Sequence, residues 1–318
     1  MKSLTIPATT LTVSHLCLGT GSFGSAVPRQ DAFALLDAFF EAGGNFVDTA
    51  RVYADWLPGG QNASERTLGE WLQASGLRDQ AVVSTKGAHP DLKTMHIARM
   101  SPEAIAHDVA ASRHYLQIEA IDLYWLHRDA LAVPVAEIMD ALNAHVQAGQ
   151  IRYFGCSNWT VARIQEANAY ARSHGLSGFV ADQPLWSLAA PNAEAIGDKT
   201  LVLLDEAGVN FHRSSGMAVI PFTSQAKGYF TKLASGTLKE SDRKQYDSPL
   251  NHERARRAQA LAERYGVSIT AIALSYLTSQ PFPVIPVIGP KTLDQLRDCL
   301  DGIDLRLTPD ELADLEAR

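Results

Sequence analysis

Three strand-like segments of the 318-residue chain each end in a titratable side chain: Asp48, Lys86 and His127. A phenol, Tyr53, follows the first of them by five residues. A lysine at the end of a buried strand needs a partner, because an unpaired charge is costly to bury. An acid, a cation, a phenol and an imidazole that meet at one edge of a sheet favour proton-transfer chemistry.

Composition and charge argue against several classes of protein. Hydrophobic residues make up 46% of the chain, which is enough for a large core. The net charge of −7 comes without a basic stripe, so we expect no nucleic-acid partner. We also expect no membrane span, because no run of about 18 apolar residues is present, and the first residues lack the apolar segment of a signal peptide.

The three cysteines, Cys17, Cys156 and Cys299, lie far apart in the sequence. Their spacing matches neither a metal-ligand motif nor a disulfide framework. We therefore expect no metal and a reduced, cytoplasmic setting.

Strand-like and helix-like segments alternate along the chain. Apolar and β-branched runs predict strands at residues 16–18, 46–49, 81–85, 121–126, 151–156, 179–183, 218–222 and 284–288. Helical periodicity predicts helices at residues 31–42, 64–74, 102–116, 134–148, 160–173, 200–207, 253–265, 269–277, 293–300 and 309–318. Eight strands in repeated βα units favour a closed (β/α)8 TIM barrel of the α/β class, formed as a single domain by residues 1–318.

Three further features refine this fold. Residues 4–13 alternate around a polar turn and predict a hairpin that plugs the bottom of the barrel. The polar stretch 227–251 has little periodicity and predicts a long loop on the catalytic face. Ser64 resembles an N-cap, and Ser101 with Pro102 begins another helix.

In such a barrel the functional residues lie at the C-terminal ends of the strands. Asp48, Lys86 and His127 end three successive strands and are therefore expected to be neighbours at the mouth. Tyr53 lies in the loop after the first of these strands, where its phenol can fold back over the mouth. Taken singly, each of the four has an ordinary structural explanation as a cap, a packed aromatic, a loop residue or a paired lysine.

Several motifs resemble a known family. They are 48–53 (DTARVY), 63–69 (ASERTLG), 84–86 (STK), 122–127 (DLYWLH), 149–158 (GQIRYFGCSN) and 182–186 (DQPLW). In this order they are similar to the signature of the aldo-keto reductase superfamily, over about residues 16–300. The resemblance implies an NADPH-dependent reductase of aldehydes or ketones.

The resemblance also implies four catalytic residues, which map onto Asp48, Tyr53, Lys86 and His127. Tyr53 would donate the proton to the reduced carbonyl oxygen, and Lys86 would lower the pKa of this phenol by favouring the phenolate. Asp48 would hold Lys86 charged, and His127 would position the substrate oxygen.

The same resemblance implies the cofactor contacts. It places Gly19, Thr20 and Gly21 near the nicotinamide ribose, Ser157, Asn158 and Gln183 on the carboxamide, and Trp186 on the nicotinamide ring, and it includes Asp48 among the cofactor contacts. It places Phe222, Ser224, Gln225, Lys227 and Gly228 by the pyrophosphate, and Gly289, Lys291, Gln295 and Asp298 by the adenosine phosphate. Lys291 points to NADPH over NADH. Gln295 stands where many members carry arginine, and Asp298-Cys299 replaces the usual acidic-asparagine pair.

The substrate would be a small carbonyl compound that lies above Tyr53 and His127, lined by Phe23, Trp56 and Trp159. Trp125 is also near the predicted mouth, and His89, Met95 and Met100 border it or simply pack in their loop. Aromatic walls accept apolar groups and sugar rings alike, so a carbohydrate-derived substrate stays open.

Two other functions stay open as well. One is a nucleotide-sensing regulatory protein, similar to a channel auxiliary subunit, with slow turnover. The other is a Schiff-base aldolase with Lys86 as its nucleophile. A salt bridge between Lys86 and Asp48 would argue against the aldolase, because a nucleophilic lysine must be neutral. The sequence leaves the oligomeric state open.

Overall fold

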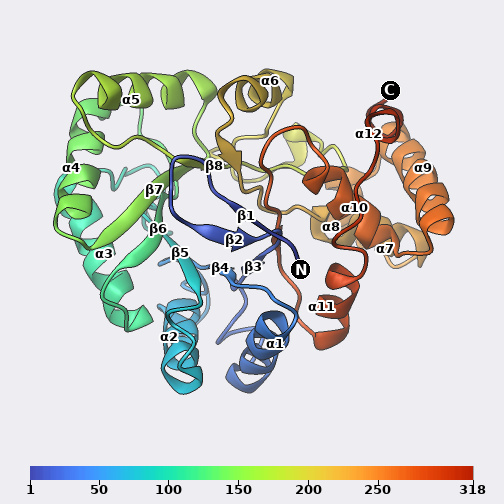
Figure 1. The fold of residues 1–318 in the computed structure, drawn as a ribbon, viewed down its shortest axis with the longest axis horizontal. Coiled ribbons are helices and arrows are strands. Elements are labelled where there is room, and N and C mark those ends of the chain that lie inside the picture. The colour runs from blue at the N-terminus through green and yellow to red at the C-terminus, as the bar shows by residue number, and fades with distance from the viewer. Residues whose placement is uncertain (318) are drawn as a thin grey trace.

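Eight short parallel strands curl into a ring that the helices enclose (Figure 1). The computed structural model describes residues 1–317. In order around the ring the strands are β10 (Val287–Ile288), β3 (Cys17–Gly19), β4 (Phe46–Asp48), β5 (Val82–Gly87), β6 (Ile121–Leu126), β7 (Ile151–Ser157), β8 (Ala181–Gln183) and β9 (Ala218–Val219). Val219 pairs with Val284, and Ile285 N donates to Val219 O at 2.9 Å, which closes the ring. The predicted TIM barrel is confirmed.

The strands read as continuous apolar runs because both of their faces are covered. Every residue of β5 and β6 is buried. Along β6, Leu123 and Trp125 pack in the barrel interior, whereas Tyr124 and Leu126 pack against the surrounding helices. This alternation aims every second residue of a strand into the barrel.

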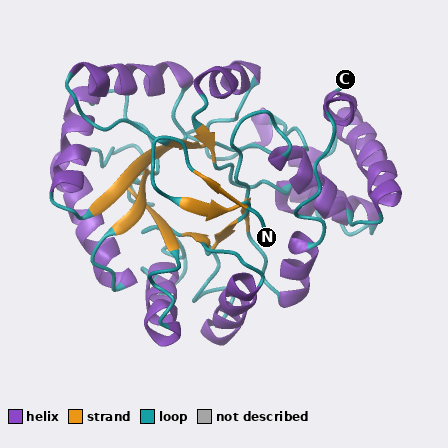
Figure 2. Cartoon of the chain, viewed as in Figure 1, coloured by secondary structure: helices purple, strands orange, loops and turns teal. Residues whose placement is uncertain are grey.

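Helices alternate with the strands along the chain and lie around the ring (Figure 2). They are α1 (Arg29–Glu41), α2 (Ala63–Ser75), α3 (Pro102–Leu116), α4 (Val135–Gln147), α5 (Val161–Ser173), α6 (Glu206–Ser215), α7 (Tyr229–Ala234), α8 (Glu240–Tyr246), α9 (Pro249–Tyr265), α10 (Ile269–Thr278), α11 (Leu293–Leu300) and α12 (Pro309–Glu316). Ser101 caps α3, as predicted, by accepting from Ala104 N. Within residues 1–317, no helix combines the length and the apolar character that crossing a membrane requires.

The N-terminal hairpin lies across one end of the barrel (Figure 1). Its strands, β1 (Ser3–Thr5) and β2 (Thr12–Ser14), pair antiparallel. Ile6, Leu11 and Val13 from this hairpin pack in the barrel interior with residues of the ring strands. The predicted plug at the bottom of the barrel is therefore present.

Two segments differ from their predictions. The sequence predicts a helix at residues 200–207, but the chain becomes helical only at Glu206. Leu203 pairs with Leu185 in a bridge, and Asp205 caps α6 by accepting from Gly208 N. Residues 227–251 are mostly helical, in α7, α8 and the start of α9, where a long loop was predicted. The buried rings of Tyr229 and Tyr246 pack against each other. Tertiary packing of this kind stabilises these short helices, and the periodicity of the sequence does not reveal it.

Ser64 is also not the helix cap that the sequence predicts, since Asn62 occupies the N-cap of α2. The buried Ser64 hydroxyl instead donates to Thr20 O at 2.8 Å and lies 2.7 Å from Thr49 Oγ1. It thereby ties together the loops that follow β3 and β4, next to the residues that end those strands.

Candidate active site

A buried ammonium group joins two strand ends and a loop at the mouth of the barrel. Lys86, in β5, is 1% exposed, and its Nζ is hydrogen-bonded to the carboxylate of Asp48. The same Nζ donates to Thr49 O at 2.9 Å and to Tyr53 Oη at 3.1 Å. An ammonium group has three hydrogens to donate, so these three contacts satisfy it fully. The structure thus brings together three of the four predicted catalytic side chains.

The Asp48 carboxylate receives donors from across the barrel. Its second oxygen accepts from Ser84 Oγ at 2.6 Å, from Trp125 Nε1 at 3.1 Å and from Gln183 Nε2 at 3.4 Å. These donors come from β5, β6 and β8. Since an ionised carboxylate only accepts, this all-donor environment suits the charged form that pairs with Lys86.

Burial and charge act in opposite directions on the two groups that share a hydrogen bond. Burial alone would lower the pKa of Lys86, but Asp48 and Tyr53 outweigh it, so the pKa lies above its ordinary value and the ammonium form persists. Burial raises the pKa of Tyr53, and the nearby Lys86 offsets only part of that rise. Lys86 thus lowers this pKa, as predicted, but burial has the larger effect and keeps the pKa above its ordinary value. Tyr53 is a protonated phenol at neutral pH, which is the form able to donate.

His127 lies directly after β6 with its ring 6.0 Å from the ring of Tyr53. Burial, Arg128 and His89 place the pKa of His127 well below its ordinary value, so the imidazole is neutral. Its buried Nδ1 has no hydrogen-bond partner among residues 1–317. An N–H at Nδ1 would be a buried donor without an acceptor, so we assign the hydrogen of the neutral imidazole to Nε2. Nε2 can then donate to a substrate oxygen. All four predicted catalytic residues thus lie in one group, called the Lys86 group below.

A cavity of about 820 Å³ extends from Tyr53 along the ends of β3, β9 and β10. Most of the residues predicted to bind a cofactor line it, together with Phe23: Gly19, Gly21, Phe222, Ser224, Gln225, Lys227, Gly228, Gly289, Lys291, Gln295 and Asp298. A Cβ atom on Gly19 would approach Val287 to 2.8 Å, so only glycine allows β3 and β10 this close. Four lysines and two aspartates line the cavity, which favours an anionic ligand: Lys227, Lys232, Lys239, Lys291, Asp242 and Asp298.

Four other residues predicted for the cofactor lie beneath the Lys86 group and not along the cavity wall. Thr20 Oγ1 donates to Asp48 O at 3.1 Å, and Ser157 Oγ donates to Gln183 O at 2.8 Å. Asn158 Nδ2 donates to the carbonyl oxygen of His127 at 3.2 Å. Gln183 keeps one buried oxygen, Oε1, with no partner among the described residues, so that atom has an unused capacity to accept a hydrogen bond.

Three predicted aromatic contacts are not supported by the geometry. Trp186 packs in the core with its ring plane 9° from that of Phe282, and it is absent from the cavity wall. Trp159 is 1% exposed and packs on Phe179, while Trp56 is 56% exposed and outside the cavity. Phe222, which follows β9, lines the cavity instead of Trp186, as Phe23 and Tyr53 also do. The position of Trp186, three residues after Gln183, does not determine whether its ring points into the cavity or into the core.

The prediction also missed side chains that hold the site in place. Ser84 lies two residues before Lys86 and therefore on the same face of the strand. The alternation of side chains along a strand would have been enough to identify it as a neighbour of the site. Arg51 N donates to Lys86 O at 3.0 Å, which fixes the loop that carries Tyr53. Its guanidinium lies 3.8 Å from Glu65, a contact between distant segments that no local pattern reveals.

Strained backbone concentrates at this face of the barrel. Several non-glycine residues in the loops after β4, β5, β7 and β9 adopt positive φ values, from 48° to 73°: Ala54, Ala88, Asn158, Thr223, Ala226 and Lys227. Such conformations persist where the surroundings impose them, and they are common at functional sites.

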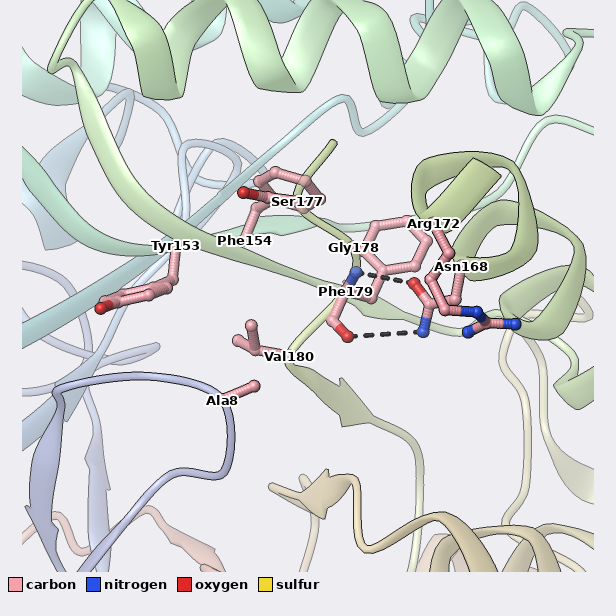
Figure 3. Close-up of a pocket in the computed structure, with 9 residues that line it drawn as sticks. All are labelled: Ala8, Tyr153, Phe154, Asn168, Arg172, Ser177, Gly178, Phe179 and Val180. Atoms are coloured by element: carbon pink, nitrogen blue, oxygen red, sulfur yellow. Dashed lines mark hydrogen bonds between the residues drawn. The ribbon is translucent and has the colours of Figure 1, made fainter. Parts of the chain in front are cut away.

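A second, smaller cavity of about 300 Å³ lies at the opposite end of the barrel, beside the N-terminal hairpin (Figure 3). Figure 3 shows that Asn168 bonds to both backbone groups of Phe179, while Ala8 from the hairpin lies at the edge. Among residues 1–317, Arg172 is the one charged residue that lines it, and no acid and base pair like that of the Lys86 group is found there.

We predict that Asp48 and Lys86 are strongly coupled in stability. Lys86→Met and Asp48→Asn should each lower the free energy of unfolding by about 3–5 kcal/mol, because each leaves its partner charged and buried. The double variant should lose less than the sum of the two. Urea denaturation of all four proteins measures this coupling. The exposed pair Arg297 and Asp294 serves as the control and should couple by about 0.5 kcal/mol or less. Additive losses for the buried pair would contradict the assignment.

Comparison with known proteins agrees with this geometry. The sequence model of the Aldo/keto reductase family matches residues 15–318. A norsolorinic acid reductase of Emericella nidulans is 32% identical over 98% of this chain and 79% of its own length. An aryl-alcohol dehydrogenase (NADP(+)) of Phanerodontia chrysosporium is 31% identical, over 96% of this chain and 82% of its own.

A solved structure shares the fold. The crystal structure of a thermostable aldo-keto reductase in complex with the inhibitor epalrestat has a TM-score of 0.72 over 99% of each chain, at 20% sequence identity. The match of the family model over nearly the whole chain decides the relationship. The chain belongs to the aldo/keto reductase family and is an oxidoreductase.

Proposed function

We propose that this protein reduces an aldehyde or ketone to an alcohol with NADPH and that Tyr53 donates the proton. The observation that carries this proposal is the hydrogen bond of 3.1 Å between Lys86 Nζ and Tyr53 Oη, at one end of the large cavity. A carbonyl oxygen that gains a hydride develops negative charge, and a positioned phenol can neutralise it by proton transfer.

The Lys86 group divides this work among its members. Tyr53 gives its proton to the developing alkoxide and becomes a phenolate beside the Lys86 ammonium, which stabilises the new negative charge. Asp48 keeps Lys86 charged and fixed. His127 donates a hydrogen bond from Nε2 to the substrate oxygen and, being neutral, adds no competing charge.

The cavity residues fit a nicotinamide dinucleotide phosphate. When bound, NADPH would supply the hydride to the carbonyl carbon. Phe222 on the cavity wall suits a planar ring against it, and the unpaired Gln183 Oε1, beneath the Lys86 group, suits an amide N–H. The cavity lysines suit phosphate groups, with Lys291 as the group nearest the expected adenosine phosphate. The NADP(+) in the name of one relative supports the same choice.

The substrate side favours an aryl carbonyl compound over a carbohydrate-derived one. Large apolar side chains are exposed on the loops that follow β4, β5 and β6, the strands that carry Asp48 and Lys86 and lead to His127: Leu57, Leu92, Met95, Ile97 and Leu131. An apolar rim of this kind suits an aromatic substrate. The names of the two relatives, an aryl-alcohol dehydrogenase and a norsolorinic acid reductase, support an aryl or related substrate.

The alternatives find less support. Lys86 is bonded to Asp48 and its pKa is raised, so it lacks the neutral amine that a Schiff-base aldolase needs. A nucleotide-sensing protein would use the same cavity but would not need a complete proton-transfer group. Cys17, Cys156 and Cys299 are all buried and free, which suits a reducing compartment such as the cytoplasm.

Tyr53→Phe tests the proton donor. We expect kcat/KM for benzaldehyde reduction to fall by about 10²–10⁴-fold, because the variant keeps the ring but lacks the acidic proton. NADPH oxidation at 340 nm measures turnover, and fluorescence titration should show an unchanged dissociation constant for NADPH. Tyr265→Phe, at an exposed tyrosine, is the matched control. Full turnover by Tyr53→Phe would refute the assigned role.

Lys291→Ala tests the phosphate site. Its dissociation constant for NADPH should rise by roughly 3- to 10-fold, because one charged contact is lost, and that for NADH should change little. Fluorescence titration with both cofactors measures the difference. Lys93→Ala, at another exposed lysine, is the control. Equal changes for the two cofactors would exclude Lys291 from the phosphate site.

A further inference from the structure

A second histidine lies against the catalytic one. The ring of His89, in the loop after β5, is 4.8 Å from the ring of His127 and inclined to it by 64°. His127 also contacts the ring of Tyr53, so the three rings are neighbours at the mouth of the barrel. His89 is 7% exposed. None of the steps described above for carbonyl reduction uses it.

The backbone around His89 is held firmly. Ala88, the residue before it, has a φ of 58°, and its N–H donates to Asp108 at 2.8 Å. Arg99 donates to the carbonyl oxygen of His89 at 3.4 Å. Because neighbours on both sides fix this stretch of chain, the imidazole is presented in a set position next to His127.

The hydrogen bonds of His89 define which of its nitrogens is free. Nδ1 lies 2.6 Å from Pro90 O, and a carbonyl oxygen can only accept, so Nδ1 carries the hydrogen. Burial and Arg128 lower the pKa of His89, against weaker opposing effects of the hydrogen bond to Pro90 and of Asp198, and the ring is neutral at neutral pH. Arg99 and His127 complete the set of charged and titratable groups around it. Nε2 is then a bare acceptor, and it makes no hydrogen bond within residues 1–317.

We propose that His89 is a specificity-determining residue that accepts a hydrogen bond from a hydroxyl group of the substrate, close to the reacting carbonyl. The preferred substrates are therefore hydroxyaryl aldehydes or ketones. This inference rests on the proposed function, because it takes the carbonyl oxygen to lie at His127.

The pairing follows from complementary polarity. Nε2–H of His127 donates and Nε2 of His89 accepts, so the two rings together match a carbonyl oxygen and a hydroxyl hydrogen on one ligand. Because the two ring centroids are only 4.8 Å apart, we expect that hydroxyl close to the carbonyl, at position 2 or 3 of the aromatic ring. A methoxy group at the same place cannot donate and leaves Nε2 unpaired.

The test compares 2-, 3- and 4-hydroxybenzaldehyde with their methoxy counterparts. In the wild type we expect kcat/KM to favour hydroxyl over methoxyl by about 3- to 10-fold at position 2 or 3, the effect of one neutral hydrogen bond. His89→Leu should abolish this ratio, and His89→Gln, which keeps an acceptor, should retain part of it. His96→Leu, the same change at an exposed histidine of the same loop, should leave the ratio as it is in the wild type.

The pH dependence of the ratio gives a second readout that packing alone would not produce. As the pH falls below the ordinary range of histidine, Nε2 gains a proton and can no longer accept, so the wild-type preference for hydroxyl should shrink. This measurement keeps the proposal testable if His89→Leu does not fold. An unchanged ratio in a folded His89→Leu, or a wild-type ratio near one at every position, would overturn it.

A binding measurement separates this inference from the proposed function. The dissociation constants of 3-hydroxybenzyl and 3-methoxybenzyl alcohol, followed by tryptophan fluorescence, need no turnover. Tighter binding of the hydroxy compound, lost in His89→Leu, supports the role of His89 even if no aldehyde is reduced. An enzyme that reduces aldehydes but binds both alcohols equally would retain the proposed function and refute the role of His89.

Discussion

The buried ammonium of Lys86 is the constraint on which the site depends. A charge at this depth needs full compensation, and the barrel supplies it from Asp48, Thr49 and Tyr53 at once. The register of β4 and β5, which pairs Asp48 with Ser84, places Lys86 beyond that pair, and the loop after β4 brings Tyr53 back onto it. The parallel barrel brings the ends of these strands to the same face, so all three groups contact the Lys86 ammonium together.

The same burial determines the protonation of the groups around the ammonium. It raises the pKa of Tyr53 and lowers that of His127, so a protonated phenol and a neutral imidazole face the mouth at neutral pH. Both can donate to one oxygen without placing a second cation beside Lys86. The ammonium then has most effect after the proton has moved, when it lies against a phenolate. A buried and fully paired cation is thus compatible with a phenol beside it that keeps its proton until the alkoxide forms.

Much of this arrangement could be predicted from the sequence because it follows from strand ends. Asp48, Lys86 and His127 each end a strand, and the barrel rule turns that order into proximity. Phe222 and Trp186 show where prediction fails, since which of two aromatics lines the cavity depends on how distant segments pack. The pKa of Tyr53 shows a related limit: the lowering effect of Lys86 can be foreseen from the sequence, but the larger, opposite effect of burial requires the folded structure. The helices within residues 227–251 likewise depend on tertiary packing.

The most direct test of the central claim is the pH dependence of kcat/KM for benzyl alcohol oxidation in the wild type and in Lys86→Met. This direction needs the phenolate, so activity rises as the pH rises through the apparent pKa of Tyr53. If the ammonium stabilises the phenolate, the rise moves to higher pH in Lys86→Met, even though the activity that remains is lower. A rise at the same pH, or at a lower one, would contradict the claim that Lys86 controls the acidity of Tyr53.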